Sequence, residues 1–270
     1  MPAPDRWALL VGIDRYPRLA ERYQLAGCGN DVRALSRVLV ERHGFPLENL
    51  VQLLDAAATR EGILMAMEDL VQRVGEGDTV LVHYSGHGSQ MPDLDGDEDD
   101  GLDETIVPSD SGRAPEPNRD IRDDEIHAWL GRLTARTPNV TLVFDCCHSG
   151  TVSRGAGRVR GVEPDLRRPA GPPTPVRRGA AGLPGGLRDL PHILLTACLA
   201  GETSHEVELG EGGESHGALT CLLVRALTAA PPDATWSGLF AAVAPEVTAL
   251  YPNQHPQIEG AADRRLFGLE

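Results

Sequence analysis

Short apolar runs alternate with helical repeats along most of the chain. The apolar runs predict strands buried on both faces, at Trp7–Ile13, Leu50–Leu54, Thr79–Tyr84, Val140–Phe144 and His192–Ala197. Apolar residues at helical spacing predict helices at Asp31–His43, Thr59–Val74, Asp123–Leu133, Gly217–Ala229 and Trp236–Leu250. This alternation indicates an α/β fold, with a mostly parallel central sheet flanked by helices on both faces.

Two segments interrupt the alternation. Pro92–Glu104 is an acidic loop, and about forty residues from Thr151 to Pro191 are rich in Gly, Pro and Arg with almost no periodicity. An insertion of this length without regular structure is either functional or disordered. We therefore expect one domain over residues 1–270, carrying a flexible and exposed insertion at 151–190. The insertion holds eight arginines: Arg154, Arg158, Arg160, Arg167, Arg168, Arg177, Arg178 and Arg188.

Composition narrows the classes of function. The formal net charge of -15 argues against nonspecific nucleic-acid binding and against anionic membranes, and it favours basic substrates. Five cysteines, an odd number, do not form a disulfide scaffold in a chain of this length, and no Cys-x-x-Cys spacing suggests zinc. With neither a signal peptide nor a long apolar span in the sequence, we expect a cytoplasmic protein, with a monomer favoured.

Candidate chemistry lies where two predicted strands end. The third strand runs into YSGHG and delivers His87, and the fourth runs into DCCHSG and delivers two cysteines. The carboxyl ends of parallel strands meet at one edge of a sheet, so an imidazole and a thiol can meet there, as thiol catalysis requires. The glycines beside His87 let backbone approach closely, and the N–H groups of Gly88 and Cys147 are candidate oxyanion donors. The alternative is a buried, inert thiol pair beside a structural histidine.

These motifs resemble a known family. The stretches LLVGIDRYP, LAGCGNDVRAL, HYSGHGSQ, DGDEDDGLDETIVP, IRDDEIHAWL, LVFDCCHSG, LLTACLAGETSHE and HGALT are similar to the caspase-like cysteine peptidases of family C14, specifically to metacaspases of bacterial type. The resemblance implies the caspase-like fold and a catalytic dyad of His87 and Cys147. It selects Cys147 over Cys146, and neighbouring strand residues in any case point to opposite faces.

The resemblance also implies the substrate. In metacaspases two acids shape the pocket for the residue before the cleaved bond, and they match Asp31 and Asp145, with Ser85 at the rim. Two carboxylates select Arg or Lys, not Asp. Other roles stay open, since Asp31 can cap a helix and Asp145 can hold a turn. The arginine-rich insertion follows Cys147, so we hypothesise that the protein cleaves itself there.

A calcium site is a further implication of the resemblance. Some metacaspases bind activating calcium through an acid of the acidic loop, an Asp-Asp pair and an acid shortly after the catalytic cysteine. Asp99, Asp100 or Asp103 matches the first position, and Asp123 and Asp124 match the second. The third position has no acid in TVSRG, which puts the site in question. An EF-hand does not fit either, because Glu98 stands where its turn needs glycine.

Together these observations predict a cysteine endopeptidase that cleaves protein or peptide substrates after Arg or Lys. No cofactor is required for the chemistry, and calcium would be regulatory. Because acids surround the thiol and oppose its ionisation, we expect activity to rise above neutral pH or to await activation. Two alternatives remain: a catalytically silent caspase-like scaffold that only binds proteins, and a different hydrolase on the same fold.

Overall fold

A six-stranded sheet forms the centre of the molecule. The computed structural model describes residues 4–94, 96, 98, 100–148, 158–167, 191–209 and 213–268. The sheet has the order β11-β8-β7-β3-β1-β2, and all its neighbours are parallel except β11. Its strands are β1 (Arg6–Gly12), β2 (Leu50–Leu54), β3 (Thr79–Ser85), β7 (Val140–Asp145), β8 (His192–Thr196) and β11 (Gln257–Gly260).

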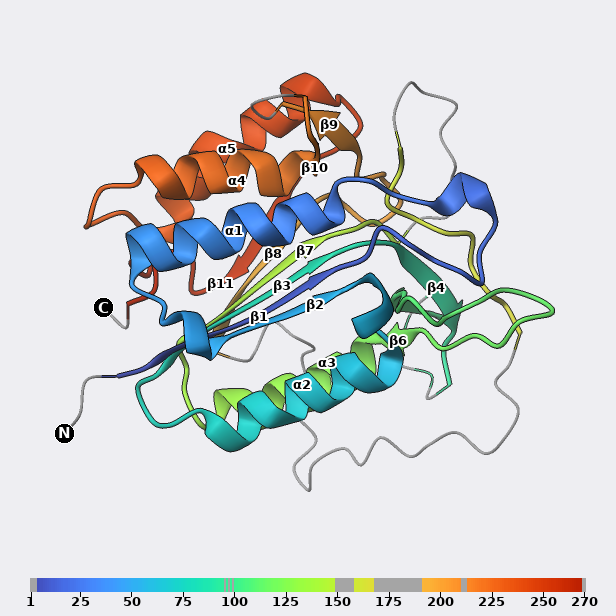
Figure 1. Ribbon diagram of the computed structural model, residues 1–270, viewed down its shortest axis with the longest axis horizontal. Helices are drawn as coiled ribbons and strands as arrows, with labels where there is room; N and C mark the ends of the chain where they lie inside the picture. Colours follow the sequence, from blue (N-terminus) through green and yellow to red (C-terminus); the bar gives the residue numbers. More distant parts are fainter. Residues whose placement is uncertain are drawn as a thin grey trace.

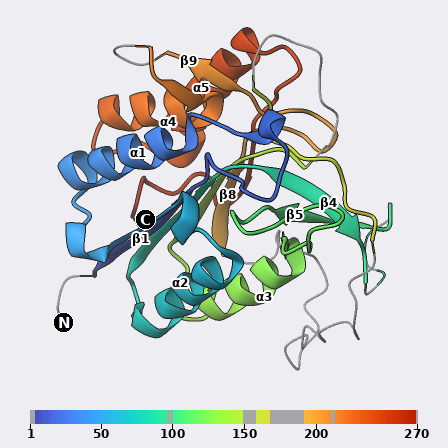
Figure 2. The same cartoon turned by 45° about the vertical axis from the view of Figure 1, so that its right-hand side comes forward.

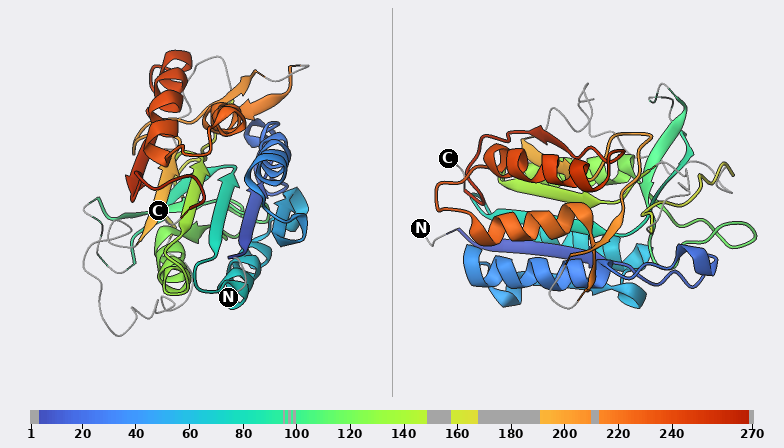
Figure 3. Two further views of the ribbon diagram at one scale, coloured as in Figure 1. Left: turned by 90° about the vertical axis from the view of Figure 1, so that its left-hand side faces the viewer. Right: turned by 90° about the horizontal axis from the view of Figure 1, so that it is seen from above.

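Helices cover both faces of this sheet (Figure 1, Figure 3). On one face lie α1 (Cys28–His43), α4 (Ala218–Ala229) and α5 (Trp236–Leu250), and on the other lie α2 (Arg60–Arg73) and α3 (Asp123–Thr134). Two apolar clusters, one on each side, hold the layers together. The first includes Met67, Leu70 and Trp129, and the second includes Leu35, Leu222 and Trp236. The expected three-layer α/β architecture is confirmed.

Smaller elements stand beyond the carboxyl ends of the parallel strands (Figure 2). The strands β4 (Gly88–Pro92), β5 (Leu102–Ile106) and β6 (Ile121–Arg122) form an antiparallel sheet, and β9 (Glu206–Glu208) pairs with β10 (Ser215–Gly217). Short 3-10 turns occur at Glu21–Tyr23, Leu47–Asn49 and Asp55–Ala57. In the described part of the chain, no helix is both long and apolar enough to cross a bilayer.

The predicted strands and long helices are all present: Leu50–Leu54 and Trp236–Leu250 have the predicted bounds, and the others have shifted ends. The largest shift is at α1, which begins at Cys28 and not at Asp31. Its first amides donate to carboxylates from distant segments: the Cys28 amide to Asp14, at 2.8 Å, and the Gly27 amide to Glu206, at 2.7 Å. Tertiary contacts therefore replace the local cap that the sequence suggested.

Candidate active site

The two predicted catalytic segments leave adjacent strands at the same height. Ser85, the last residue of β3, is paired with Asp145, the last residue of β7, and His87 and Cys147 each follow two residues later. A Cβ on Gly88 would lie 2.4 Å from the carbonyl oxygen of Cys147, so the two loops touch backbone to backbone. Both side chains are fully buried. The structure thus brings together the histidine and cysteine segments that lie sixty residues apart in sequence.

Backbone and aromatic groups fix the His87 ring. Its Nε2 lies 2.6 Å from the carbonyl oxygen of Tyr23, and a carbonyl only accepts, so Nε2 carries the proton. In the neutral ring Nδ1 is then the basic nitrogen, and among the described residues it has no hydrogen-bond partner of good geometry. The ring of Tyr16 packs at 4.7 Å between centroids, and its hydroxyl accepts from the His87 amide at 2.8 Å. The imidazole ring is therefore held by a hydrogen bond at Nε2 and by packing against Tyr16.

Burial keeps both members of the pair neutral. Burial, reinforced by the charges of Arg160 and Arg113, lowers the pKa of His87 to about 3. Burial raises the pKa of the Cys147 thiol to about 12, even though a hydrogen bond with the Ser204 backbone opposes the shift. At neutral pH this state therefore contains a neutral thiol and a neutral imidazole.

Part of the arginine-rich insertion occupies the space in front of these groups. The carbonyl oxygen of Arg160 accepts the backbone N–H of Cys147 at 3.0 Å and that of Gly88 at 3.2 Å. These are the two donors that the sequence suggested for an oxyanion. The Arg160 amide donates to the carbonyl of Ser204 at 2.9 Å, and the Glu206 amide donates to the carbonyl of Arg158 at 2.9 Å. Residues 158–160 are therefore aligned as an extended peptide with one carbonyl against two amide donors.

The Arg160 side chain fills a buried acidic pocket. One guanidinium nitrogen lies 2.8 Å from Asp31, and the other donates to Ser85 Oγ at 2.7 Å and lies 3.5 Å from Asp145. Glu206 approaches the guanidinium at 3.5 Å, and Arg160 is entirely inaccessible to solvent. All three predicted pocket residues contact the arginine. Glu206 was missed by the sequence reasoning, although it ends the motif LLTACLAGETSHE that carried part of the resemblance.

Comparison with known proteins tests the family resemblance seen in the sequence motifs. The family model described as "Metacaspase, peptidase C14 domain" matches residues 6–154, more than half of the chain. The chain belongs to the metacaspase family. Metacaspase-1 of Pyricularia oryzae is 42% identical over 178 residues, which is 62% of this chain and 43% of that protein. Metacaspase-1A of Aspergillus oryzae is 43% identical over 152 residues, 54% of this chain and 35% of that protein, so each match spans less than half of the relative's length.

A solved bacterial structure extends the likeness to the whole metacaspase chain. The crystal structure of protein GSU0716 from Geobacter sulfurreducens is similar with a TM-score of 0.69 and 25% sequence identity. The match covers 98% of this chain and 99% of the other. The caspase-like fold implied by the sequence motifs is therefore confirmed over residues well beyond the family model.

Fixed donors hold the pocket acids in place. Asp31 accepts from the backbone amide of Gly217 at 3.1 Å and lies 3.0 Å from His216 Nδ1. Burial alone would raise the pKa of Asp31, but the Arg160 guanidinium and His216 outweigh it and hold the pKa below its usual value. Asp31 lies inside the first turn of α1 and is not its N-cap, which is Gly27, so the capping alternative is wrong.

Asp145 faces the pocket, and the donors to its carboxylate come from distant segments and not from its own turn. Its carboxylate accepts from Ser204 Oγ at 2.8 Å, from the Thr220 amide at 2.9 Å and from Thr220 Oγ1 at 2.7 Å, while also facing Arg160. These bonds join β7 to α4 and to the segment before β9. Asp145 therefore connects the segments that line the pocket and also contributes a negative charge facing Arg160.

A glycine wall makes room for the guanidinium. A Cβ on Gly217 would lie 2.2 Å from a guanidinium nitrogen of Arg160 and 2.2 Å from Asp145 Oδ2. The glycines beside His87 serve close packing: a Cβ on Gly86 would lie 2.7 Å from the hydroxyls of Tyr16 and Tyr84. The sequence reasoning singled out the glycines of YSGHG but not Gly217, although Gly217 lies in the motif HGALT that carried part of the resemblance.

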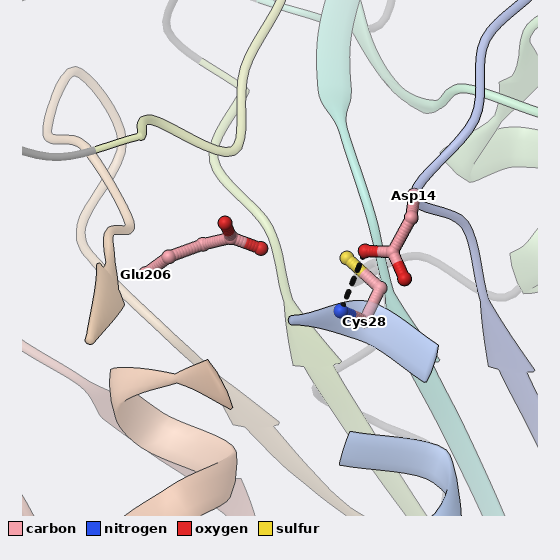
Figure 4. A group of neighbouring side chains, drawn as sticks. All are labelled: Asp14, Cys28 and Glu206. Carbon is pink, nitrogen blue, oxygen red and sulfur yellow. Dashed lines mark hydrogen bonds between the residues drawn. The ribbon is translucent and has the colours of Figure 1, made fainter. Parts of the chain in front are cut away.

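One group of potential metal ligands lies beside the pocket. The ligand atoms of Asp14, Cys28 and Glu206 all lie within 4.8 Å of one another (Figure 4). The carboxylate of Asp14 accepts the amides of Cys28 and Gly29, and Glu206 accepts that of Gly27. Burial raises the pKa of the Cys28 thiol, which favours its protonated form. We assign this group to anchoring the N-terminus of α1, because amide donors already occupy the carboxylates.

The acids of the calcium prediction are partly neutralised by an arginine. Arg122 lies 3.2 Å from Asp103 and 2.9 Å from Asp124. Burial, with neighbouring acids adding to it, raises the pKa of Asp123 to about 8 and that of Asp103 to about 6. Asp100 holds its own turn by accepting the Leu102 amide, and Asp99 lies outside the described residues. A calcium ion here would have to displace Arg122 from two carboxylates.

The expectation that the whole insertion is exposed is wrong for part of it. Arg160 and Val162 are fully buried, because the acidic pocket accepts the guanidinium and the flanking backbone finds partners on both sides. Arg158 and Arg167 are exposed. The other insertion arginines lie outside the described residues: Arg154, Arg168, Arg177, Arg178 and Arg188.

Proposed function

We propose that this chain is a cysteine endopeptidase that cleaves peptide bonds after Arg or Lys. The observation that supports this best is the position of Arg160: its guanidinium lies among three carboxylates while its carbonyl oxygen accepts two amides, one of them that of Cys147. A planar guanidinium suits such a pocket because it donates to several acceptors at once. A lysine side chain keeps the positive charge but lacks the planar set of N–H donors, so lysine is the weaker substrate residue.

Each residue has a role in the proposed reaction. Nδ1 of His87 takes the proton of the Cys147 thiol, and the sulfur forms a bond to the carbonyl carbon of the substrate arginine. The N–H groups of Gly88 and Cys147 hold the oxyanion. The carbon–nitrogen bond breaks as the protonated imidazole gives its proton to the leaving amine, and water then hydrolyses the thioester. The Tyr23 carbonyl, which accepts from Nε2, orients the ring and stabilises its protonated form.

The same reaction would act on the chain itself. Arg160 and Gly161 lie where a substrate would lie, so we propose that the bond between them is the first one cut and that the uncut segment blocks other substrates. The chemistry needs no cofactor. Calcium binding by Asp100, Asp103, Asp123 and Asp124 stays a regulatory proposal, in which the ion displaces Arg122.

A panel of fluorogenic peptides ending in Arg, Lys or Asp tests the function. After incubation to complete any self-cleavage, the wild type should hydrolyse the Arg peptide fastest, the Lys peptide more slowly and the Asp peptide negligibly. Cys147→Ala should lose at least about 10³-fold in activity, whereas Cys146→Ala, the same change at the adjacent buried thiol, should stay active. Parallel assays with calcium and with chelator test its regulatory role. Equal turnover by Cys147→Ala, or preference for Asp, would reject the proposal.

Thiol labelling gives an independent check on the occupied cleft. In a His87→Gln chain, which should remain uncut, iodoacetamide should label Cys147 at least about 10²-fold more slowly at pH 8 than it labels a free cysteine, because a thiol pKa of about 12 leaves little thiolate. The rate should rise about tenfold for each pH unit. Partly buried Cys221 serves as the internal control for reagent access. Rapid labelling of Cys147 at pH 8 would show that the segment does not close the cleft.

A further inference from the structure

The insertion does not stop at Arg160 but continues along the edge of β4. Gly161 forms a parallel bridge with Gly88, the Val162 amide donates to the Gly88 carbonyl at 3.0 Å, and the Asp165 amide donates to the Gln90 carbonyl at 3.0 Å. The other edge of β4 pairs with β5. Residues 161–165 therefore lie along the free edge of β4, held by an isolated bridge and two backbone hydrogen bonds. Peptides that bind to a sheet edge in this way gain affinity from backbone bonds and selectivity from side-chain pockets.

The side chains of this edge segment differ in how deeply they are buried. Val162 is fully buried although it belongs to neither apolar cluster of the domain, and its amide is bonded to β4. Gly161 is buried as well, whereas Leu166 is 66% exposed. Glu163 points outward and lies 3.6 Å from Arg22, with both side chains about half exposed, so this pair contributes little.

The backbone beside Glu163 is also held from outside β4. Its carbonyl accepts from Ser89 Oγ and from Arg113 Nε, each at 3.2 Å. On the other side of the Arg160–Gly161 bond, residues 158–160 align with the segment that leads into β9, through the bridge between Val159 and His205. Both flanks of the bond are therefore bound, each by a different piece of the domain.

We propose that the edge of β4 is a substrate-binding strand that selects residues after the cleaved bond: a small residue first, then a β-branched apolar residue. This rests on the proposed peptidase function and adds a determinant to it. Protein substrates would be recognised as extended segments of the form Arg-Gly-Val, not by arginine alone. A charged residue at the Val162 position would be buried without a partner and strongly disfavoured.

Peptides carrying the sequence of residues 158–167 test this with the self-cleaved wild type, by mass spectrometry of the Arg–Gly bond. Replacing the valine that corresponds to Val162 by Asp should lower kcat/KM by about 100-fold or more, and replacing it by Ala by about tenfold. The matched control is Asp in place of the leucine corresponding to exposed Leu166, which should change kcat/KM by less than about threefold. In the full-length chain, Val162→Asp should slow cleavage after Arg160, and Leu166→Asp should not.

The fluorogenic Arg peptide separates the two levels of the argument, because it has no amino acid after the cleaved bond. If this peptide is hydrolysed while the Val and Asp peptides are cut equally well, β4 selects nothing and the inference is overturned, with the peptidase function intact. If neither the fluorogenic peptide nor the longer peptides are cut, the peptidase function itself fails and the inference falls with it.

Discussion

Replacing Arg160 by Gln should leave the chain intact between residues 160 and 161, where the wild type should separate into fragments 1–160 and 161–270. The neutral amide removes the charge that faces three buried carboxylates, and it cannot reach them all. A site built to pair with a charged or polar group discriminates by about 10⁴- to 10⁵-fold against a ligand that lacks it. We therefore expect cleavage at this bond to fall by at least about 10³-fold, as measured by intact mass and N-terminal sequencing.

Two further variants make the Arg160 result specific. Arg160→Lys keeps the charge without the fork and should be cut at a reduced but measurable rate. Arg158→Gln makes the identical change at a neighbouring arginine, whose side chain is 55% exposed and comes no closer than 3.7 Å to Glu206. This variant should be cut nearly as fast as the wild type. Cleavage after residue 160 in the Gln variant, or wild-type cuts that map only elsewhere, would contradict the assignment of Arg160 to the pocket.

Periodicity was sufficient to predict the main layers of the fold. The buried apolar runs and the helical repeats are long enough to show their periods, and each period indicates which side chains face the sheet. Within the described residues, six further strands were not predicted. They are short and depend on pairing: β4 pairs with β5, and β11 pairs with β8 at the edge of the main sheet. No local pattern encodes such pairing. The start of α1 was missed for the same reason, since Asp14 and Glu206 hold its first amides.

The candidate site likewise contains residues that the sequence predicted and residues that only the folded structure identifies. His87 and Cys147 could be located from sequence because each follows a buried strand, and strand ends gather at one edge of a parallel sheet. The acids Asp31 and Asp145 came from motifs. Nothing in the sequence singled out Arg160 among the eight arginines of the insertion. Which arginine enters the pocket depends on how the insertion pairs with β4 and with the segment before β9. Glu206 and Gly217 likewise become pocket residues only through folding.

Replacing Gly217 by Ala should abolish cleavage after arginine while the domain stays folded. The added Cβ would lie 2.2 Å from both the Arg160 guanidinium and Asp145 Oδ2, and neither can retreat: Asp145 is bound by Ser204 and Thr220. The backbone itself tolerates alanine, because Gly217 has φ −69° and ψ 138°. We expect hydrolysis of the fluorogenic Arg peptide and cleavage after Arg160 to fall by about 10³-fold, with a cooperative thermal transition retained.

Labelling of Cys147 distinguishes a blocked pocket from a damaged one. If the methyl group expels the arginine, the segment in front of the thiol loses its anchor, and iodoacetamide should label Cys147 faster than in an uncut His87→Gln chain. The matched control is Gly131→Ala in α3, where the added Cβ has no neighbour within 4 Å. This variant should cleave normally and gain about 0.5–1 kcal/mol in the free energy of unfolding, as alanine replaces glycine in a helix. If Gly217→Ala cleaves normally after Arg160, the Arg160 guanidinium does not lie beside Gly217 when the bond is cut.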